Sequence, residues 1–204
     1  MVFISYSVFD KVKKKNKISL ISGCPCSGKT TLANTLASSE EKGAHLPLDS
    51  FFEFLVHPIS PTLPESHQQN ISILKSGARA AKALFEDGYD VFVDWVILPW
   101  ALLVILEEFK SEVPVEYIVL RASLDEELKR AANRKEDIRL HAEVPFAEIV
   151  KVMHPSFADL GELEKNVLDT EGLTSEQVFA KCEEKRNKGK FDLDLKEAIK
   201  IELA

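Results

Sequence analysis

The chain has 204 residues, of which 45% are hydrophobic, so we expect one domain with a sizeable core rather than two independent domains. Its 33 acidic and 26 basic side chains give a net charge of −7, which argues against a nucleic-acid-binding protein that relies on a broad basic surface. The most apolar stretch, residues 95–106, is too short to span a bilayer, and the first lysines follow the apolar start instead of preceding it. These features predict a cytoplasmic protein with no membrane span and no secretory signal.

In chain order, a lysine-containing lead-in over residues 1–16 is followed by residues 17–22, which have the apolar character of a buried strand. The next eight residues, Gly23-Cys24-Pro25-Cys26-Ser27-Gly28-Lys29-Thr30, complete the pattern G-x-x-x-x-G-K-[ST]. A helix is predicted from Thr30 to Ser39. A strand, this loop and a helix in succession are the context in which the pattern binds nucleotide phosphates.

Each position of this phosphate loop has a chemical task. The two glycines let the backbone turn so that successive N–H groups point at a polyphosphate, which the positive end of the following helix also faces. Lys29 neutralises the outer phosphates, and the Thr30 hydroxyl binds Mg²⁺. ATP and Mg²⁺ are the predicted cofactors, and the predicted nucleotide-binding residues are Gly23, Cys24, Pro25, Cys26, Ser27, Gly28, Lys29, Thr30 and Thr31.

Two of the three cysteines, Cys24 and Cys26, lie in the phosphate loop, and Cys182 lies on a late charged helix. This placement suggests no disulfide framework. No second Cys or His pair follows at the spacing of a zinc site, which disfavours metal binding by the loop thiols. Two interpretations stay open. The thiols are small residues that fill the loop, or the helix N-terminus and Lys29 lower their pKa, so that oxidation blocks nucleotide entry.

Strand and helix patterns alternate along the rest of the chain. Further strands are predicted at 44–49, 90–95, 115–120 and 167–169. Helices are predicted from the capping-box patterns at 50–53, 66–69, 123–126 and 174–177, from Pro99 to about Lys110, and over an appended amphipathic tail at 189–204. The helix over 99–109 is apolar nearly all round, so it is either fully buried or forms an oligomer contact.

This alternation predicts an α/β fold with a parallel sheet and helices on both faces. We expect a main domain over residues 17–188 with a lid region at about 124–155. The lead-in 1–16 precedes this domain, and a C-terminal extension, 189–204, follows it.

Two carboxylates are expected where such a sheet binds its ligand, beyond the carboxyl ends of the strands. The second strand is predicted to end at Asp49 and the third at Asp94, and both come near a transferred phosphate if these strands flank the first. Phosphoryl transfer needs an acceptor for the hydroxyl proton, for which we choose Asp49, and a metal, for which we choose Asp94 with Thr30. The alternatives are helix capping by Asp49 and an ordinary polar strand end at Asp94.

The helix predicted from residue 123 carries two arginines suited to closing over the phosphates. Arg130 and Arg134 lie four residues apart and therefore on one helix face. Their guanidinium groups can stabilise the transferring charge, with Arg134 as the first choice and Arg130 as the second. Arg121, at the end of the fourth strand, is held in reserve. The alternative is an exposed helix with an ion pair between Glu126 and Arg130.

Over about residues 17–188 the chain resembles the small P-loop kinases that include chloramphenicol phosphotransferase, gluconate kinase and the zeta toxins. The residues that carry the resemblance are the loop from Gly23 to Thr30, Leu48-Asp49-Ser50-Phe51-Phe52, Val93-Asp94 and the arginine-containing helix. The resemblance implies a three-layer P-loop NTPase fold with five strands in the order 2-3-1-4-5. It also implies ATP-dependent phosphorylation of a small hydroxyl compound, with Asp49 as proton acceptor.

One further segment is similar to this group, and another departs from it. Residues 166–174 are similar to the part of these folds that holds the adenine. Many of these kinases have Arg-Gly-Asp or a similar lid after the two arginines, where this chain has Lys135-Glu136-Asp137.

Two classes of function remain. One is a kinase that passes phosphate from a nucleoside triphosphate to a small-molecule acceptor, and the other is a regulatory protein that binds ATP or GTP without transferring phosphate. Asp49 favours the kinase, because a switch has no use for a base there. The sequence has no Asn/Thr-Lys-x-Asp segment for reading guanine, which argues against a GTPase. A nucleotide or oligonucleotide kinase shares the mechanism, but the acidic net charge argues against an oligonucleotide.

Overall fold

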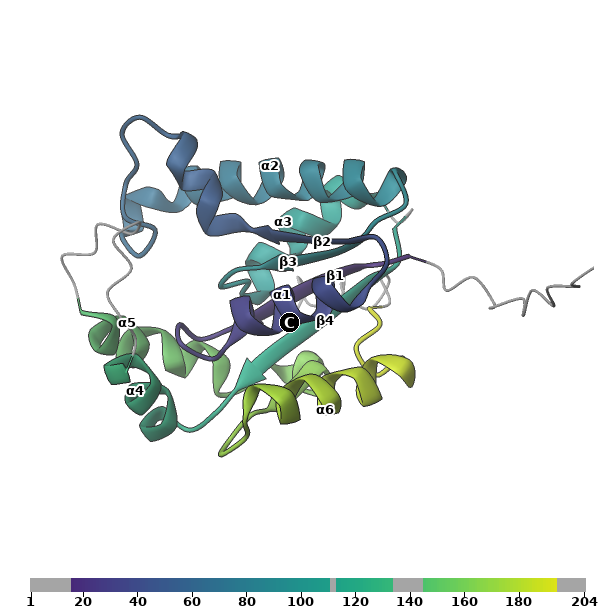
Figure 1. Cartoon of the computed structure of the whole chain (residues 1–204). Helices are drawn as coiled ribbons and strands as arrows, with labels where there is room; N and C mark the ends of the chain where they lie inside the picture. The colour runs from purple at the N-terminus through teal and green to yellow at the C-terminus, as the bar shows by residue number, and fades with distance from the viewer. Residues whose placement is uncertain (1–15, 111–112, 134–144, 194–204) are drawn as a thin grey trace, which may run out of the picture.

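The computed structural model describes residues 16–110, 113–133 and 145–193. Five strands in this part of the chain form one parallel sheet in the order β2-β3-β1-β4-β5 (Figure 1). The strands are β1 (Ile18–Gly23), β2 (Gly43–Pro47), β3 (Asp90–Asp94), β4 (Val115–Arg121) and β5 (Val167–Asp169). The predicted α/β class and the strand order 2-3-1-4-5 are therefore confirmed.

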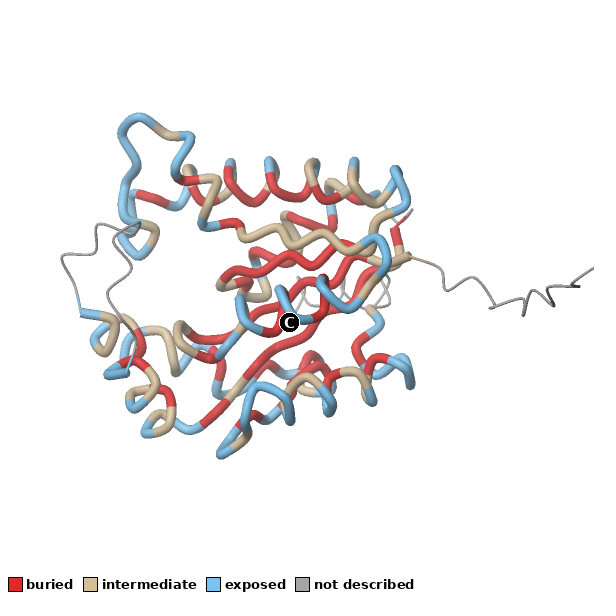
Figure 2. Tube along the Cα trace, viewed as in Figure 1, coloured by how far each residue is buried: buried red, intermediate tan, exposed pale blue. Residues whose placement is uncertain are grey.

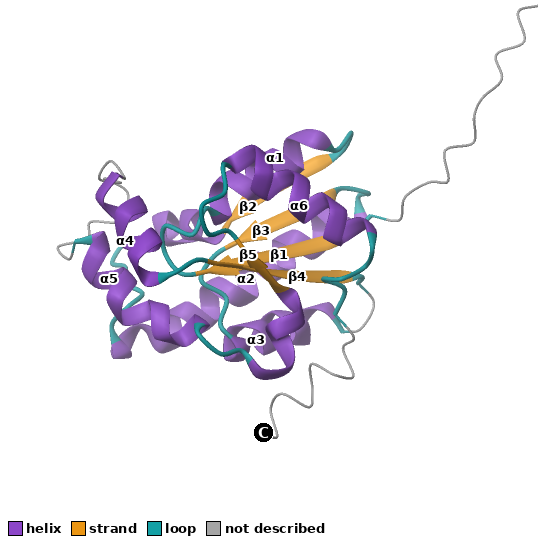
Figure 3. Cartoon of the chain, turned by 90° about the horizontal axis from the view of Figure 1, so that it is seen from below, coloured by secondary structure: helices purple, strands orange, loops and turns teal. Residues whose placement is uncertain are grey.

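Helices cover both faces of the sheet, which makes three layers. One face carries α1 (Lys29–Ser39) and α6 (Ser175–Asn187), and the other carries α2 (His67–Glu86) and α3 (Pro99–Phe109), as Figure 3 shows. Two shorter helices, α4 (Leu124–Asn133) and α5 (Phe146–Met153), lie beyond the carboxyl ends of the strands (Figure 1). The ligand side of the sheet is thus next to these two helices.

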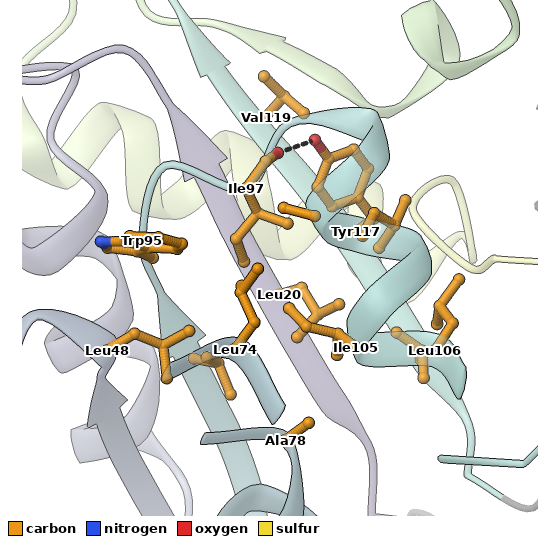
Figure 4. Close-up of a cluster of buried hydrophobic side chains, with 14 of the residues drawn as sticks. Leu20, Leu48, Leu74, Ala78, Trp95, Ile97, Ile105, Leu106, Tyr117 and Val119 are labelled. Atoms are coloured by element: carbon orange, nitrogen blue, oxygen red, sulfur yellow. Dashed lines mark hydrogen bonds between the residues drawn. The ribbon is translucent and has the colours of Figure 1, made fainter. Parts of the chain in front are cut away.

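The core follows from the two-residue period of strands whose faces are both covered. Ile18 and Leu20 of β1 face α2 and α3, whereas Ile21 faces α1 and α6. Figure 4 shows the larger cluster, in which the Tyr117 hydroxyl donates a hydrogen bond of 2.6 Å to the carbonyl of Ile97. Figure 2 shows how burial varies along the chain: the strands are buried inside, and the helices are exposed on their outer sides.

The apolar character of α3 is explained by this core. Its buried residues are Ala101, Leu102, Ile105, Leu106 and Phe109. Of the two alternatives predicted for this helix, burial within the chain explains its apolar residues. The described residues lend no support to an oligomer contact through α3. Among the described residues, no helix combines the length and hydropathy that crossing a bilayer requires.

Two of the four predicted capping boxes are wrong. The second strand ends at Pro47, and a 3-10 helix begins at Leu48 and runs to Phe54, so Ser50 lies inside the helix and does not cap it. Ser66 precedes α2, but its hydroxyl donates to the carbonyls of Pro61 and Leu63 and accepts from the Asn70 side chain, and it caps no backbone N–H of the helix. Serine has several nearby backbone partners, so the pattern alone does not decide which one it takes.

The other two helix starts behave as predicted. The Ser123 hydroxyl accepts a 3.3 Å hydrogen bond from the backbone N–H of Glu126. Thr174 and Gln177 form the complete reciprocal capping box at the start of α6.

The predicted tail helix does not begin at Gly189. Residues 189–193 form a turn and a bridge in which Asp192 pairs with Glu116 of β4, and the Phe191 side chain is fully buried. The rest of that tail, nearly all of the lead-in 1–16, and residues 134–144 of the lid region lie outside the described residues. The sequence did not predict α5 or the 3-10 helices His154–Phe157 and Gly161–Asn166.

Candidate active site

The phosphate loop joins β1 to α1, and both of its glycines have positive φ angles, 142° at Gly23 and 99° at Gly28. A Cβ at Gly23 would lie 2.4 Å from the carbonyl oxygen of Leu120, so a side chain cannot be accommodated there. Gly28 is the N-cap of α1, which has no side-chain cap. The first N–H groups of α1 therefore lack a side-chain acceptor at the end where an anion is stabilised.

Lys29 folds back on the loop, and its Nζ donates a 2.9 Å hydrogen bond to the carbonyl of Cys24. Burial lowers the pKa of the Lys29 ammonium, and the carboxylates of Asp49 and Asp94 act against that change. Lys29 thus lies within the electrostatic reach of both predicted carboxylates. Those carboxylates, which come from different segments, share one site with the loop lysine.

Asp94 ends β3 and is 3% exposed. Its Oδ2 accepts a 2.6 Å hydrogen bond from the Thr30 hydroxyl, and its Oδ1 lies 2.5 Å from Nε2 of His45. Strand pairing produces this geometry, because Asp94 is in register with Ile21 of β1 on one side and with Pro47 of β2 on the other. A hydroxyl and a carboxylate side by side are oxygen ligands that fit Mg²⁺.

Asp49 does not end the second strand, contrary to the sequence prediction. It lies two residues past the end of β2, on the Leu48–Phe54 3-10 helix, and its side chain is exposed. Its Oδ1 accepts a 2.9 Å hydrogen bond from the indole Nε1 of Trp95, the residue that follows Asp94. Trp95 therefore links the two carboxylate segments and orients Asp49.

Among the arginines in the part of the chain that the structure describes, Arg130 is the one that contacts the phosphate loop. Its guanidinium donates to the carbonyl of Thr170 at 2.8 Å and lies 3.5 Å from the carbonyl of Ser27. It also pairs with Glu126 at 3.0 Å, so the ion pair considered from the sequence is present at the same time. Arg134, the first choice from the sequence, lies outside the described residues.

Arg121, the reserve candidate, has a structural role in this arrangement. Its two terminal nitrogens form a bidentate pair with the Glu164 carboxylate at 2.8 and 2.9 Å. It also donates to the carbonyls of Phe157 and Ala158, each at 3.1 Å. These contacts connect the end of β4 to the segment before β5 rather than to the phosphate loop.

A pocket of about 270 Å³ adjoins the phosphate loop. Five segments contribute to it: the loop itself, α1, α4, the connection from β5 to α6 and the start of α6. Its lining residues are Ser27, Gly28, Thr31, Leu32, Thr35, Arg130, Leu173, Ser175 and Val178. The segment 166–174, singled out by resemblance, thus contributes one residue, and the start of α6 contributes two that sequence reasoning missed.

Cys24 contradicts the hypothesis of a thiol with lowered pKa. Its side chain is fully buried, and burial together with the Glu127 carboxylate raises the pKa of the thiol. Cys182 is also buried, and burial raises its pKa to about 12. The oxidation hypothesis is therefore wrong for Cys24, because desolvation outweighs the charge of Lys29.

Two residues of the site had no assigned role from the sequence. His45 lies on β2, paired with Phe92 of β3, and Trp95 directly follows β3. The sequence does show His45 as a polar residue within a predicted strand. That observation points to Asp94 only once β2 is known to lie beside β3.

No protein-family model and no curated protein sequence matches the chain. Among solved structures, it is similar to a sugar kinase from Janibacter sp. HTCC2649, with a TM-score of 0.61 and 16% identity over 82% of this chain and 92% of that chain. A gluconokinase from Sinorhizobium meliloti 1021 has a TM-score of 0.60 and 13% identity, over 82% and 89%. A thymidylate kinase from Candida albicans has a TM-score of 0.53 and 16% identity, over 88% and 96%.

These similarities concern the fold, because all three identities are low. They include sugar kinases and a thymidylate kinase, so they do not single out the narrower group with chloramphenicol phosphotransferase and the zeta toxins. Together with the strand order and the phosphate loop, they show that the chain has the P-loop NTPase kinase fold.

Proposed function

We propose that this protein is a kinase that transfers the γ-phosphate of ATP to a hydroxyl group of a small molecule. One observation carries the proposal. Lys29, Thr30, Asp94 and Asp49 meet at the carboxyl end of a parallel sheet, directly after a complete phosphate loop. A nucleotide switch needs the first three of these residues but has no need of the fourth.

The loop amides and Lys29 hold the phosphate tail in this proposal. Lys29 exchanges its hydrogen bond with the carbonyl of Cys24 for one with a phosphate oxygen, which restores the solvation that burial removes. Thr30 and Asp94 are the residues that would hold Mg²⁺, which neutralises phosphate charge when it is bound. Arg130 lies at the loop and stabilises negative charge from the lid side.

Asp49 is the proposed proton acceptor. The acceptor hydroxyl oxygen forms a bond to the γ-phosphorus as the bond from phosphorus to the bridging oxygen of ADP breaks, and the hydroxyl proton passes to the Asp49 carboxylate. The hydrogen bond from Trp95 occupies Oδ1 and so directs the remaining lone pairs of the carboxylate. Its exposure gives an acceptor molecule access to it.

The nucleoside is assigned to the pocket beside the loop. Leu173 and Val178 supply apolar contact, and the Arg130 guanidinium supplies a planar surface on which a base stacks. A pocket of about 270 Å³ suits a nucleoside rather than a larger cofactor. Threonine and serine hydroxyls at its edge, from Thr35 and Ser175, offer hydrogen bonds to the ribose or the base.

The acceptor is proposed to be uncharged and partly apolar. Residues 43–74, which contain Asp49, include no lysine and no arginine. The same segment and the start of α3 expose large apolar side chains: Phe54, Val56, Ile59, Leu63 and Trp100. An acidic sugar or a nucleotide acceptor calls for cationic partners, whereas an alcohol with an apolar body fits these residues.

Two substitutions test the proposal with purified protein. Lys29→Ala should weaken binding of Mg²⁺-ATP by about 10–100-fold, because a charge-assisted contact to phosphate is removed. Asp49→Asn should bind the nucleotide normally and lose about 10²–10⁴-fold in turnover. Binding is measured by titration calorimetry, and turnover by ADP release with neutral aromatic alcohols, sugars, sugar acids and nucleosides as acceptors.

Glu53→Gln is the matched control, since Glu53 is an exposed carboxylate on the same 3-10 helix. It should retain both binding and turnover. Equal turnover in Asp49→Asn would remove Asp49 as the base. Tight nucleotide binding with no transfer to any acceptor class would favour the regulatory alternative.

A further inference from the structure

Three potential metal ligands from distant parts of the chain meet beneath the phosphate loop. They are Cys24 of the loop, Glu127 on α4 and His154 in the 3-10 helix that follows α5. The thiol sulfur, a carboxylate oxygen and an imidazole nitrogen all lie within 4.8 Å of one another. Sequence spacing could not reveal this group, because about 100 residues separate Cys24 from Glu127.

The group is closed off from solvent on two sides. Cys24 is fully buried and Glu127 is 1% exposed, whereas the His154 side chain is 20% exposed and offers a path of entry. His154 Nδ1 lies 2.9 Å from the Glu127 carboxylate, and the Cys24 sulfur lies 3.8 Å from the carbonyl oxygen of Val150. A buried carboxylate needs hydrogen-bonding or charged partners, and the groups that face Glu127 here are the His154 imidazole and the Cys24 thiol.

We propose that Cys24, Glu127 and His154 form a binding site for Zn²⁺. A set with one sulfur, one nitrogen and one oxygen donor suits this borderline-soft ion and excludes Mg²⁺, which prefers oxygen ligands. Tetrahedral coordination places such donors about 3.3–3.6 Å apart, so donor atoms at the 4.8 Å limit have to close by about 1.2–1.5 Å, and the His154 and Glu127 atoms at 2.9 Å have to open slightly. Three protein ligands leave the fourth position for water.

Binding takes up the thiol as a thiolate and releases its proton to solvent. The ion would join three segments: the phosphate loop, α4 and the 3-10 helix after α5. Because α4 also carries Arg130, the ion would hold the base of the lid region against the phosphate loop. This site does not depend on the proposed kinase function: Cys24 is assigned to nucleotide binding as part of the loop backbone, whereas Zn²⁺ would take its side chain, and Glu127 and His154 have no assigned role in the reaction.

The test uses the full-length protein without nucleotide, after removal of metals with a chelator. One equivalent of Zn²⁺ should bind per chain, and Co²⁺ in its place should give the near-ultraviolet charge-transfer absorption of a cobalt–thiolate bond. Cys24→Ser should abolish this absorption. His154→Gln and Glu127→Gln should each weaken Zn²⁺ binding by more than about 100-fold, because removal of a ligand costs at least as much as removal of an outer-shell partner.

Cys26→Ser is the matched control, because Cys26 lies in the same loop but outside the three-residue group. It should keep the cobalt–thiolate absorption. If Cys24→Ser does not fold, His154→Gln decides the question, since it leaves the phosphate loop unchanged. Absence of stoichiometric Zn²⁺ binding, or the same affinity in His154→Gln as in the unsubstituted protein, overturns the proposal whether or not the protein proves to be a kinase.

Discussion

Asp94 is the residue on which most of the site converges. It is 3% exposed and accepts from the Thr30 hydroxyl through one oxygen, while the other oxygen lies 2.5 Å from Nε2 of His45. A carboxylate held at both oxygens keeps its orientation when an ion binds. In the proposed magnesium site, His45 would therefore act as a positioning residue for the Asp94 oxygens.

Removal of the His45 ring tests this positioning role. His45→Ala should raise the Mg²⁺ concentration for half-maximal nucleotide binding by about 10–100-fold, the cost typical of lost outer-shell partners. A fluorescent ATP analogue titrated with Mg²⁺ measures this effect without any turnover. His45→Gln, whose amide nitrogen can reach Asp94, should restore most of the loss.

His57→Ala is the corresponding control, because His57 is an exposed histidine after the same strand. It should leave the Mg²⁺ dependence unchanged. An unaltered Mg²⁺ dependence in His45→Ala would show that Asp94 keeps its orientation without the ring.

At the scale of elements, the 3-10 helix that carries Asp49 is held in place by α2. Gly77 of α2 is buried against Leu48, and a Cβ at residue 77 would lie 2.1 Å from the Leu48 Cδ2 atom. Leu48 is itself fully buried in the larger core cluster, so it has little room to move. The absence of a side chain at Gly77 therefore sets how closely the Asp49 segment approaches the sheet.

Gly77→Ala should destabilise the protein by about 1 kcal/mol. Overpacking in a core costs about 1–3 kcal/mol, and the better helix propensity of alanine offsets about 1 kcal/mol of that cost. Turnover should fall while nucleotide affinity stays the same, because Leu48 directly precedes Asp49. Urea unfolding and the kinetic assay measure the two effects.

Ser76→Ala, at an exposed neighbouring position of α2, serves as the reference and should change stability by less than about 0.5 kcal/mol. A more stable Gly77→Ala protein with unchanged turnover would mean that Leu48 repacks without moving Asp49.

At the scale of the whole molecule, a buried ionic network connects the sheet to α6. The Glu116 carboxylate of β4 accepts from Arg186 of α6 at 2.8 Å, from Ser19 of β1 at 2.8 Å and from Lys17 at 3.0 Å. Glu116 is 1% exposed and Arg186 is 5% exposed. Burial opposes ionisation of Glu116, but Arg186 and Ser19 more than compensate and lower the pKa of its carboxyl.

Glu116→Ala should cost about 3–5 kcal/mol, because it leaves the Arg186 charge buried with fewer partners. Glu108→Ala, which breaks a surface pair with Arg79, should cost far less, because solvent screens that pair. Denaturant unfolding of both proteins at pH 7 measures the contrast. A cost below about 1 kcal/mol for Glu116→Ala would contradict the view that this network holds α6 to the sheet.

The same network predicts how stability changes with pH. The folded-state pKa of Glu116 lies below its ordinary value of 4.5, so the ionised carboxylate stabilises the folded state above that pH. The stabilisation is lost as the pH falls through the folded-state pKa. The difference in stability between the unsubstituted protein and Glu116→Gln should therefore shrink in acid, and a constant difference from pH 7 to acid would exclude this linkage.

Local chemistry made several features predictable from the sequence. The phosphate loop depends on two glycines and a lysine within eight residues, and β1, β3 and β4 are recognisable because both of their faces are buried. The capping box at the start of α6 was also predictable, since its two residues, Thr174 and Gln177, lie three positions apart. The patterns at Ser50 and Ser66 failed because nearby structure changed the helix start or offered other acceptors.

The sequence by itself determined the phosphate loop, the alternation of strands and helices and the position of Asp94 at the end of a strand, because these depend on near neighbours in the chain. The tertiary structure alone decided the contacts of Asp94 with His45, of Asp49 with Trp95, and of Cys24 with Glu127 and His154. His45 and Asp94, and likewise Asp49 and Trp95, are 46 or more positions apart, and strand order and register bring them together. Glu127 and His154, which lie in the lid segments, are more than 20 positions apart. A periodic pattern records which face of an element is buried, but not which element lies beside it.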